Sequence, residues 1–308
     1  PPWSYYVLSA FGPSASEAYA ASMNGSSSIV KCFASKSLDV GESLFRRVNG
    51  NYRTQWSSGS TIAAAVTNVP AIGNLLVATI DLDATVGTVE ATSIVQTGVT
   101  WTRAVAKTVI NNHAVEIWYG LVTSAAGTTA TVNLGAFTCD GGTVNICEYS
   151  YSGTLLVDQT ASNNGNSIST DTGTTAATTA TNELWVGVTG TFQRAQSTPT
   201  NGFTLLDGTF AANSSNAYLE KIAVATGTAN SGTTIVSGQW FGAIACFRAI
   251  PGFTFLTWIQ PAGAAAQPIF SYDSGAGVGL NLWQNPFATL SLGLVPTSGS
   301  TQTVSVGS

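Results

Sequence analysis

The residues that most often carry catalysis are scarce in this chain. His113 is its only histidine, and no Gly-x-Ser-x-Gly sequence is present to hold a serine nucleophile. Its place in the segment Asn111-Asn112-His113 predicts a turn residue ahead of a strand rather than a catalytic base. A single histidine without clustered carboxylates or thiols also makes a poor zinc site. We therefore expect no catalytic residue, no metal ligand and no cofactor.

Two aspartates form the one close pair of carboxylates. Asp81 and Asp83 are two residues apart after an apolar run, so their side chains are expected on one face of a strand. Such a pair could support glycoside hydrolysis or bind Ca²⁺. Aspartates at strand ends are more often solvated turn residues, and that interpretation is favoured here. Further aspartates are scattered in expected loops, namely Asp158, Asp171 and Asp207.

Tryptophans are the other candidates for ligand contact. Several lie in strand-like runs and are expected in the core rather than on a sugar-stacking surface, namely Trp101, Trp118, Trp185, Trp240 and Trp258. Trp56 and Trp283 instead precede turn-like segments, Ser57-Ser58-Gly59 and Gln284-Asn285-Pro286. These two are the candidate ligand contacts.

The composition predicts that strands position these residues. Only 8% of the 308 residues are charged, while 44% are hydrophobic, so neither a disordered chain nor a charged helical bundle fits. Thr, Val and aromatic residues suit the pleated surface of a sheet. The net charge of −5, with no basic cluster beyond Arg46-Arg47, argues against nucleic-acid binding. No apolar stretch approaches the roughly 18 residues of a membrane span.

A repeated pattern divides the chain after about residue 60. Four features recur in the same order, which favours duplication over chance similarity in a Thr/Gly-rich chain. They are Asn74-Leu75-Leu76-Val77 with Asn182-Glu183-Leu184-Trp185, Gly98-Val99-Thr100-Trp101 with Gly202-Phe203-Thr204-Leu205, Gly127-Thr128-Thr129 with Gly232-Thr233-Thr234, and Cys147 with Cys246. Because one sheet cannot bury its apolar face alone, two similar sheets packed face to face are expected.

The fold class predicted is all-β, an antiparallel, jelly-roll-like β-sandwich with duplicated halves and further strands at both ends. We expect an N-terminal β-rich segment over 1–59, the sandwich over 60–249 and a partial β segment over 250–308. Asn49-Gly50-Asn51 predicts a turn, and Thr160 to Thr181 a linking loop with a polar edge strand.

Four cysteines allow three pairings, and no Cys-x-x-Cys motif is present. The cysteines are Cys32, Cys139, Cys147 and Cys246. Cys147 and Cys246 lie in apolar runs, which favours buried, unpaired thiols. The first residues lack the pattern of a signal peptide, and the absence of a first Met suggests a processed chain or part of a longer one.

Two stretches of the chain resemble known modules. The run Phe253-Thr254 with Trp258-Ile259 and Pro261, followed by Ile269-Phe270-Ser271, resembles the opening strands of laminin-G/concanavalin-like domains, which are jelly-roll sandwiches that often bind glycans. Residues 60–249 resemble a β-sandwich module of bacteriophage virion proteins and secreted bacterial surface proteins. The features that carry this second resemblance are Gly73 to Val77, Gly98 to Trp101, Ile117 to Tyr119, Glu148-Tyr149 with Ser152-Gly153, and Asn182-Glu183-Leu184. It implies display or adhesion, without chemistry.

These observations predict a non-enzymatic structural or display protein of a virion, such as a phage decoration, fibre or spike subunit, located on the virion surface or outside the cell. A neutral surface of hydroxyl and amide groups has a modest free-energy cost of desolvation, so many copies can pack together. The expected partners are further copies, other virion or surface-assembly proteins and glycans, but not nucleic acid or membranes. Alternatives are a secreted bacterial or archaeal adhesin or filament subunit, and a carbohydrate-binding or glycan-active protein. A solitary body with a deep polar pocket gathering acids around His113 would overturn the mechanical role.

Overall fold

The computed structural model consists of strands and their connections. It describes residues 5–11, 45–56, 58–84, 89–110, 113–135, 138–209 and 214–250, and the strands within 252–306. For 5–11, 51, 56, 106–110 and the strands after 250, only the backbone is described. The predicted all-β class is confirmed, and the sheets of the larger unit and the four-stranded sheet of the smaller unit are antiparallel. The described residues include no helix that could cross a membrane.

The chain divides into two compact units, and the smaller one combines residues 1–10, 14–37 and 253–308. In it, β1 (Tyr5–Phe11) pairs with β15 (Gly252–Trp258). A four-stranded antiparallel sheet follows in sequence order, formed by β16 (Gln267–Asp273), β17 (Gly279–Asn285), β18 (Thr289–Val295) and β19 (Gln302–Val306). The N-terminal strand thus joins C-terminal strands.

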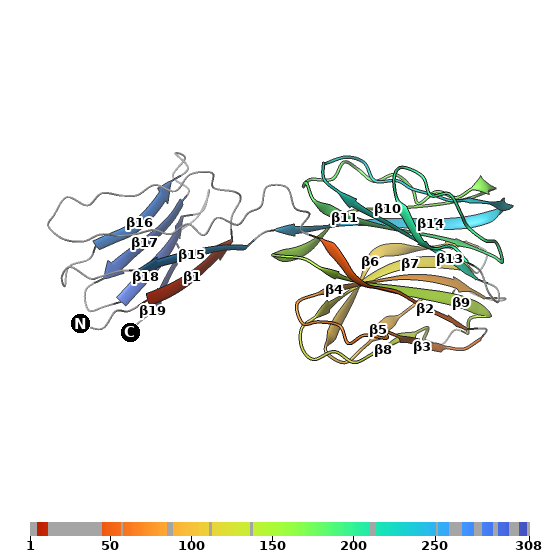
Figure 1. Cartoon of the computed structure of the whole chain (residues 1–308), viewed down its shortest axis with the longest axis horizontal. Helices are drawn as coiled ribbons and strands as arrows, with labels where there is room; N and C mark the ends of the chain where they lie inside the picture. Colours follow the sequence, from red (N-terminus) through yellow and green to blue (C-terminus); the bar gives the residue numbers. More distant parts are fainter. Residues whose placement is uncertain are drawn as a thin grey trace. The chain divides into compact units, whose positions relative to one another are not determined.

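The larger unit contains two five-stranded sheets with one topology (Figure 1). The first has the order β2-β9-β4-β7-β6, with β2 (Arg46–Trp56), β4 (Leu75–Asp83), β6 (Val99–Ile110), β7 (His113–Val122) and β9 (Gly141–Ser150). The second has the order β10-β14-β11-β13-β12, with β10 (Thr154–Ser169), β11 (Glu183–Thr191), β12 (Thr204–Asp207), β13 (Ser215–Ala223) and β14 (Thr234–Ile250). Taken in chain order, the five strands of each sheet occupy the same five places, as duplicated halves require.

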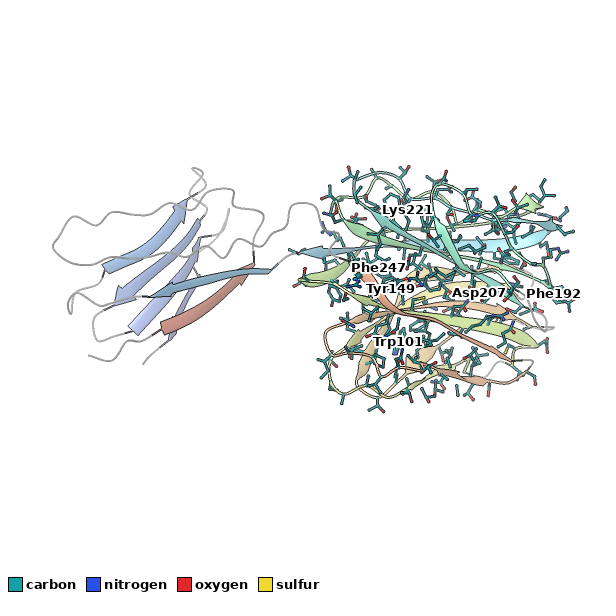
Figure 2. The ribbon with its side chains drawn as sticks, in the orientation of Figure 1. Trp101, Tyr149, Phe192, Asp207, Lys221 and Phe247 are labelled. Atoms are coloured by element: carbon teal, nitrogen blue, oxygen red, sulfur yellow. The ribbon has the colours of Figure 1, made fainter. Side chains whose placement is uncertain are left out.

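Apolar side chains bury both faces of each five-stranded sheet. Tyr149 and Phe247 belong to the core between these sheets (Figure 2). The outer face of the first sheet packs on a small sheet of β3 (Thr61–Ala65), β8 (Thr129–Asn133) and β5 (Ser93–Val95). The run Leu75–Leu82 is buried on both faces, because it is the central strand of a covered sheet.

The outer face of the second sheet is covered without regular strands. Backbone hydrogen bonds join Thr170 to Thr233, Thr172 to Ser231 and Thr175 to Ala229, over a smaller apolar cluster. These bonds occupy the position that β3 and β8 hold in the first half.

The two five-stranded sheets share one topology, but the two cysteines that the sequence repeat matches point to opposite faces of their sheets. Val77 pairs with Cys147, and Trp185 pairs with Cys246, so the matched positions share a place in the ladder. Cys147 nevertheless faces the core between the sheets, while Cys246 faces the outer cluster. Because side chains alternate along a strand, a shift of one residue exchanges the two faces. Both thiols are buried and unpaired, as predicted; Cys32 lies outside the described residues.

The expected boundary at residue 59 differs from the structure. Residues 46–56 form β2, which pairs with β9 and belongs to the sandwich. Asn49-Gly50-Asn51 is not a turn but a break in pairing within β2, where the register shifts between Arg47 and Asn49 and again before Tyr52. Gly50 has φ of 116° and lies against Cys147, so a side chain at this place would collide with the neighbouring strand. The positive φ that the Asn-Gly sequence indicates therefore occurs in a β-bulge rather than in a turn.

Candidate functional site

A row of buried polar side chains crosses the interface between the two five-stranded sheets. Thr79, on β4, donates to Asn216 Oδ1 at 3.1 Å, and Asn216 Nδ2 donates to the carbonyl oxygens of Thr79 and Thr143 at 2.9 and 3.1 Å. Asn216 lies on β13 of the other sheet, so these bonds tie the sheets together. All three side chains are fully buried. The interface is therefore polar along this row and apolar around Phe247, while the hydroxyl of Tyr149 makes buried hydrogen bonds to Tyr218 and Glu220.

The row continues to His113. Ser214 donates its hydroxyl to Asp81 Oδ2 at 2.5 Å, and Asp81 Oδ1 lies 2.5 Å from His113 Nε2. His113 Nδ1 is 3.6 Å from Asp83, so the imidazole sits between two carboxylates. Its ring also stacks on Phe241, with centroids 4.4 Å apart and an interplanar angle of 12°. The two aspartates share a face, as predicted, because they alternate with Leu82 along β4.

His113 is a buried cation rather than a turn residue. It is the first residue of β7 and only 3% exposed, so the expectation of a turn residue was wrong. Burial favours the neutral imidazole, but the charge and hydrogen bond of Asp81, with those of Asp83, outweigh it and raise the pKa of His113 from 6.5 to about 9. The imidazole is thus protonated at neutral pH. Asp81 and Asp83 are its partners, not solvated turn residues.

The set Ser214, Asp81 and His113 has the residue types of a hydrolase triad in the wrong order. In a triad the histidine lies between serine and aspartate and takes the proton of the serine hydroxyl. Here Asp81 lies in the middle, and the protonated imidazole has no site left to accept that proton. Ser214 is also fully buried. No group of three His, Cys, Asp or Glu side chains in the described part of the chain is arranged to hold a metal ion.

A pocket opens beside His113 at one end of the sandwich. Its volume is about 490 Å³, and residues of both sheets line it: Asp83, His113, Asn166, Phe192, Arg194, Ser237, Gly238, Gln239 and Phe241. Phe192, which follows β11, is 43% exposed at this end of the sandwich (Figure 2). The pocket therefore combines charged, amide and aromatic groups.

Arg194 is fixed in this pocket by backbone atoms. Its Nη1 donates to the carbonyl of Phe192 at 2.6 Å, and its Nε donates to the carbonyl of Ser237 at 3.2 Å. Gly238 lies so close under the guanidinium that a Cβ there would collide with it. Among the described residues no carboxylate forms an ion pair with Arg194, whereas His113 is paired with two. Arg194 is thus a cation held by backbone carbonyls, without an ion pair to any described carboxylate.

The sequence-predicted ligand contacts do not meet at this site. Trp56 ends β2 opposite Gly142, and Trp283 lies in β17 of the smaller unit opposite Pro268 and Ser291. Their side chains, like that of Trp258, lie outside the described residues. The core positions predicted for Trp118, Trp185 and Trp240 are confirmed, since all are at most 6% exposed, while Trp101 is half-buried.

The residues of the pocket were missed because they come from segments far apart in the chain. Arg194 follows β11, whereas Asp83 and His113 belong to the other sheet. No local spacing connects them. The one signal was the pair Asp81 and Asp83 on a shared face, ahead of the single histidine.

The remaining aspartates are held in ion pairs or loops. Asp158 lies within β10, not in a loop as expected, and Arg248 Nε lies 3.6 Å from it. Asp207 is the last residue of β12, so it too is not in a loop as expected, and it pairs with Arg53 Nε at 2.9 Å, which links the two sheets at an edge. Asp171 lies in the connection after β10 and accepts from Asn230 at 2.6 Å. These carboxylates stabilise the fold and do not gather in the pocket.

Comparison with known proteins finds no family model that matches the chain, and no match among curated proteins or solved structures. The two resemblances noted in the sequence therefore remain predictions.

Proposed function

We propose that this protein is a non-enzymatic structural or display subunit of a surface assembly, such as a virion, in which copies of the chain contact one another through an almost uncharged exterior. The observation that carries the proposal is the placement of charge. Among the side chains described, Arg46, Arg47 and Arg103 are the only exposed charged ones. Every acidic side chain in that part of the chain is buried or half-buried.

An exterior of this kind favours packing of copies. Like charges on two approaching surfaces repel, and charged groups are costly to remove from water. Hydroxyl and amide groups can be desolvated when they find hydrogen-bond partners across a contact. A protein selected to remain solitary usually carries mixed charges over its surface. The near absence of such charges supports a role in close-packed assemblies.

The edge strand β10 is the contact that best fits this role. It is 16 residues long and is an edge strand of its sheet. Its second half lies in the stretch Thr160 to Thr181, for which the sequence predicts a polar edge strand. It contains no Lys, Arg or Pro, the residues that usually prevent pairing between edges, and its single charge is Asp158. Asp158 is engaged by Arg248 and by Thr179, so it does not repel a second strand.

The acids around His113 and the pocket beside them are the kind of feature that counts against a purely mechanical role. Their chemistry is nevertheless compatible with a non-enzymatic protein. The acids gathered there hold the imidazole as a cation, and the serine beside them donates to a carboxylate. Neither group is available as a base or a nucleophile. The pocket next to them suits binding rather than chemistry.

The proposal is tested by introducing charge on β10. The double variant Thr160→Lys/Asn164→Lys places two cations at exposed positions of this edge, and Thr67→Lys/Thr226→Lys adds the same charge at exposed positions elsewhere. Light scattering between about 1 and 100 µM, the range of ordinary specific association, measures the molar mass. We expect multimers for the wild-type chain and the control, and monomers for the β10 variant. A wild-type chain that stays monomeric over this range would contradict the proposal.

A further inference from the structure

We propose that the pocket beside His113 binds a carboxylate-bearing sugar, such as a uronic acid or a sialic acid, with its carboxylate on Arg194. This goes beyond the assembly role, because a chain could assemble without this pocket. The pocket is formed by residues of both sheets, so it exists only when the sandwich is closed.

Arg194 is the anchor for the carboxylate. A guanidinium binds a carboxylate through two parallel hydrogen bonds, and the pairing is strongest when the arginine is already held in place. Phe192 and Ser237 hold Arg194 through their carbonyl oxygens, and Gly238 leaves room for it to lie flat. No carboxylate in the described chain forms an ion pair with it, which leaves the charge for a ligand.

The other wall of the pocket suits hydroxyl groups. Asp83 is half-buried and its carboxylate can accept hydrogen bonds from ligand hydroxyls, while the side-chain amides of Asn166 and Gln239 can both donate and accept. Since a positive group and a negative group lie in one pocket, a ligand with an acid at one end and hydroxyls at the other is complementary. A simple anion would use only Arg194.

Aromatic and apolar groups complete the pocket. Phe192 is exposed, and Phe241, which also lines the pocket, is buried and stacked on His113. The C–H face of a sugar ring packs on aromatic rings of this kind, while its edge makes hydrogen bonds. Ile168 and Val236, exposed by 62% and 78%, lie on the paired strands β10 and β14 close in sequence to pocket residues.

The test is a titration of the full chain with three monosaccharides, in which NMR measures the binding of each sugar. N-acetylneuraminic acid and glucuronic acid are the acidic probes, and glucose is the neutral one. We expect saturable binding of at least one acid, with a dissociation constant of about 0.1–5 mM for so small a ligand. Glucose should bind at least tenfold more weakly. Acetate and inorganic phosphate, tested alongside, should also bind at least tenfold more weakly than the acidic sugar.

Variants separate the pocket from the rest of the surface. Arg194→Gln should weaken acid binding at least tenfold, Arg194→Lys by a smaller factor, and Phe192→Ala by several-fold. Arg46→Gln removes the same charge at an exposed position of β2, and binding should not change. An unchanged thermal unfolding midpoint shows that each variant is folded. If Arg194→Gln does not fold, Phe192→Ala still tests whether the sugar binds in this pocket.

Four results would overturn the proposal: no saturable binding of either acid, equal binding of glucose, equal binding of acetate or phosphate, or acid binding that survives both Arg194→Gln and Phe192→Ala. These results concern sugar binding, whereas the assembly role is tested by the molar mass in solution. Failure of one proposal is therefore distinguishable from failure of the other.

Discussion

The two halves of the sandwich share one topology but cover their outer faces in different ways. In the first half, the three strands β3, β8 and β5 bury a large apolar cluster that includes Ile80 and Leu82. In the second half, Thr-rich connections cover a small cluster around Leu219, and buried hydroxyls bond to the backbone. One sheet topology can thus be covered either by apolar packing or by hydroxyl hydrogen bonds. Substitutions in each half test that difference.

Removing apolar volume should cost most in the first half. Leu76→Ala deletes a fully buried side chain from the larger cluster and should destabilise the chain by about 2–5 kcal/mol. Leu219→Ala, the matched change in the smaller cluster, should cost less, because the irregular layer above it can move into the space. Chemical denaturation measures both free energies of unfolding. Equal losses would remove the energetic distinction between the halves.

The interface between the halves should depend on pH through His113. Its folded pKa of about 9 lies above the ordinary 6.5, so its stabilisation is fully present below pH 6.5 and is lost as the pH rises through about 9. The shift corresponds to on the order of 3 kcal/mol. His113→Phe, which keeps a ring against Phe241, should therefore be more strongly destabilised relative to wild type at pH 6 than near pH 10. Unfolding titrations at several pH values measure this difference.

Arg46→Gln serves as the control for that experiment, since it removes an exposed charge far along the chain from His113. Its free energy of unfolding should follow the wild-type pH profile. A His113→Phe variant with that same profile would show that His113 is not a buried cation.

Removing a hydroxyl should affect the second half. Thr172 accepts a hydrogen bond from the Ser231 backbone amide at 2.9 Å and is fully buried. Thr172→Val leaves that amide without its hydroxyl partner and should cost about 1–3 kcal/mol, although it adds apolar surface. Thr172→Ser keeps the hydroxyl and should lose less. If valine is neutral or stabilising, hydroxyl bonding does not hold this layer.

The smallest effect is expected at Glu183, at the start of β11. Burial raises the pKa of Glu183 to about 7, reinforced by the negative charge of Asp158 and opposed by the hydrogen bond from Trp185. A raised carboxyl pKa means that folding becomes less favourable as the pH rises from about 4.5 through about 7. Glu183→Gln should therefore raise stability at pH 8 by on the order of 1 kcal/mol and have little effect at pH 4. Thermal unfolding at the two pH values measures it, and a lower midpoint at pH 8 would contradict the prediction.

Much of the fold could be predicted because local patterns decide it. The run from Leu75 to Ile80 indicates a strand covered on both sides, and tryptophans in apolar runs, such as Trp185, indicate cores. Four short matches indicate the duplication. The sequence matches did not predict that Cys147 and Cys246 point to opposite faces of their sheets, because an error of one residue in a match exchanges the two faces. Gly50 lies in a bulge where the sequence predicts a turn, because both features use a positive φ.

The candidate site could not be predicted in the same way. His113 and Asp81 are 32 residues apart, and Ser214 comes from the other half of the sandwich. Only the packing of the two sheets brings them together. The low total of charged residues indicates few charges on the exterior, but it did not reveal that every described acidic side chain is buried or half-buried.

Sedimentation equilibrium of the full chain at low and high salt, about 50 and 500 mM, tests whether an uncharged exterior drives association, because these concentrations bracket strong and weak charge effects. If copies associate in this way, the molar mass should correspond to a multimer and should not fall at the higher salt. A monomer at both salt concentrations, or a multimer that dissociates when salt is added, would contradict it.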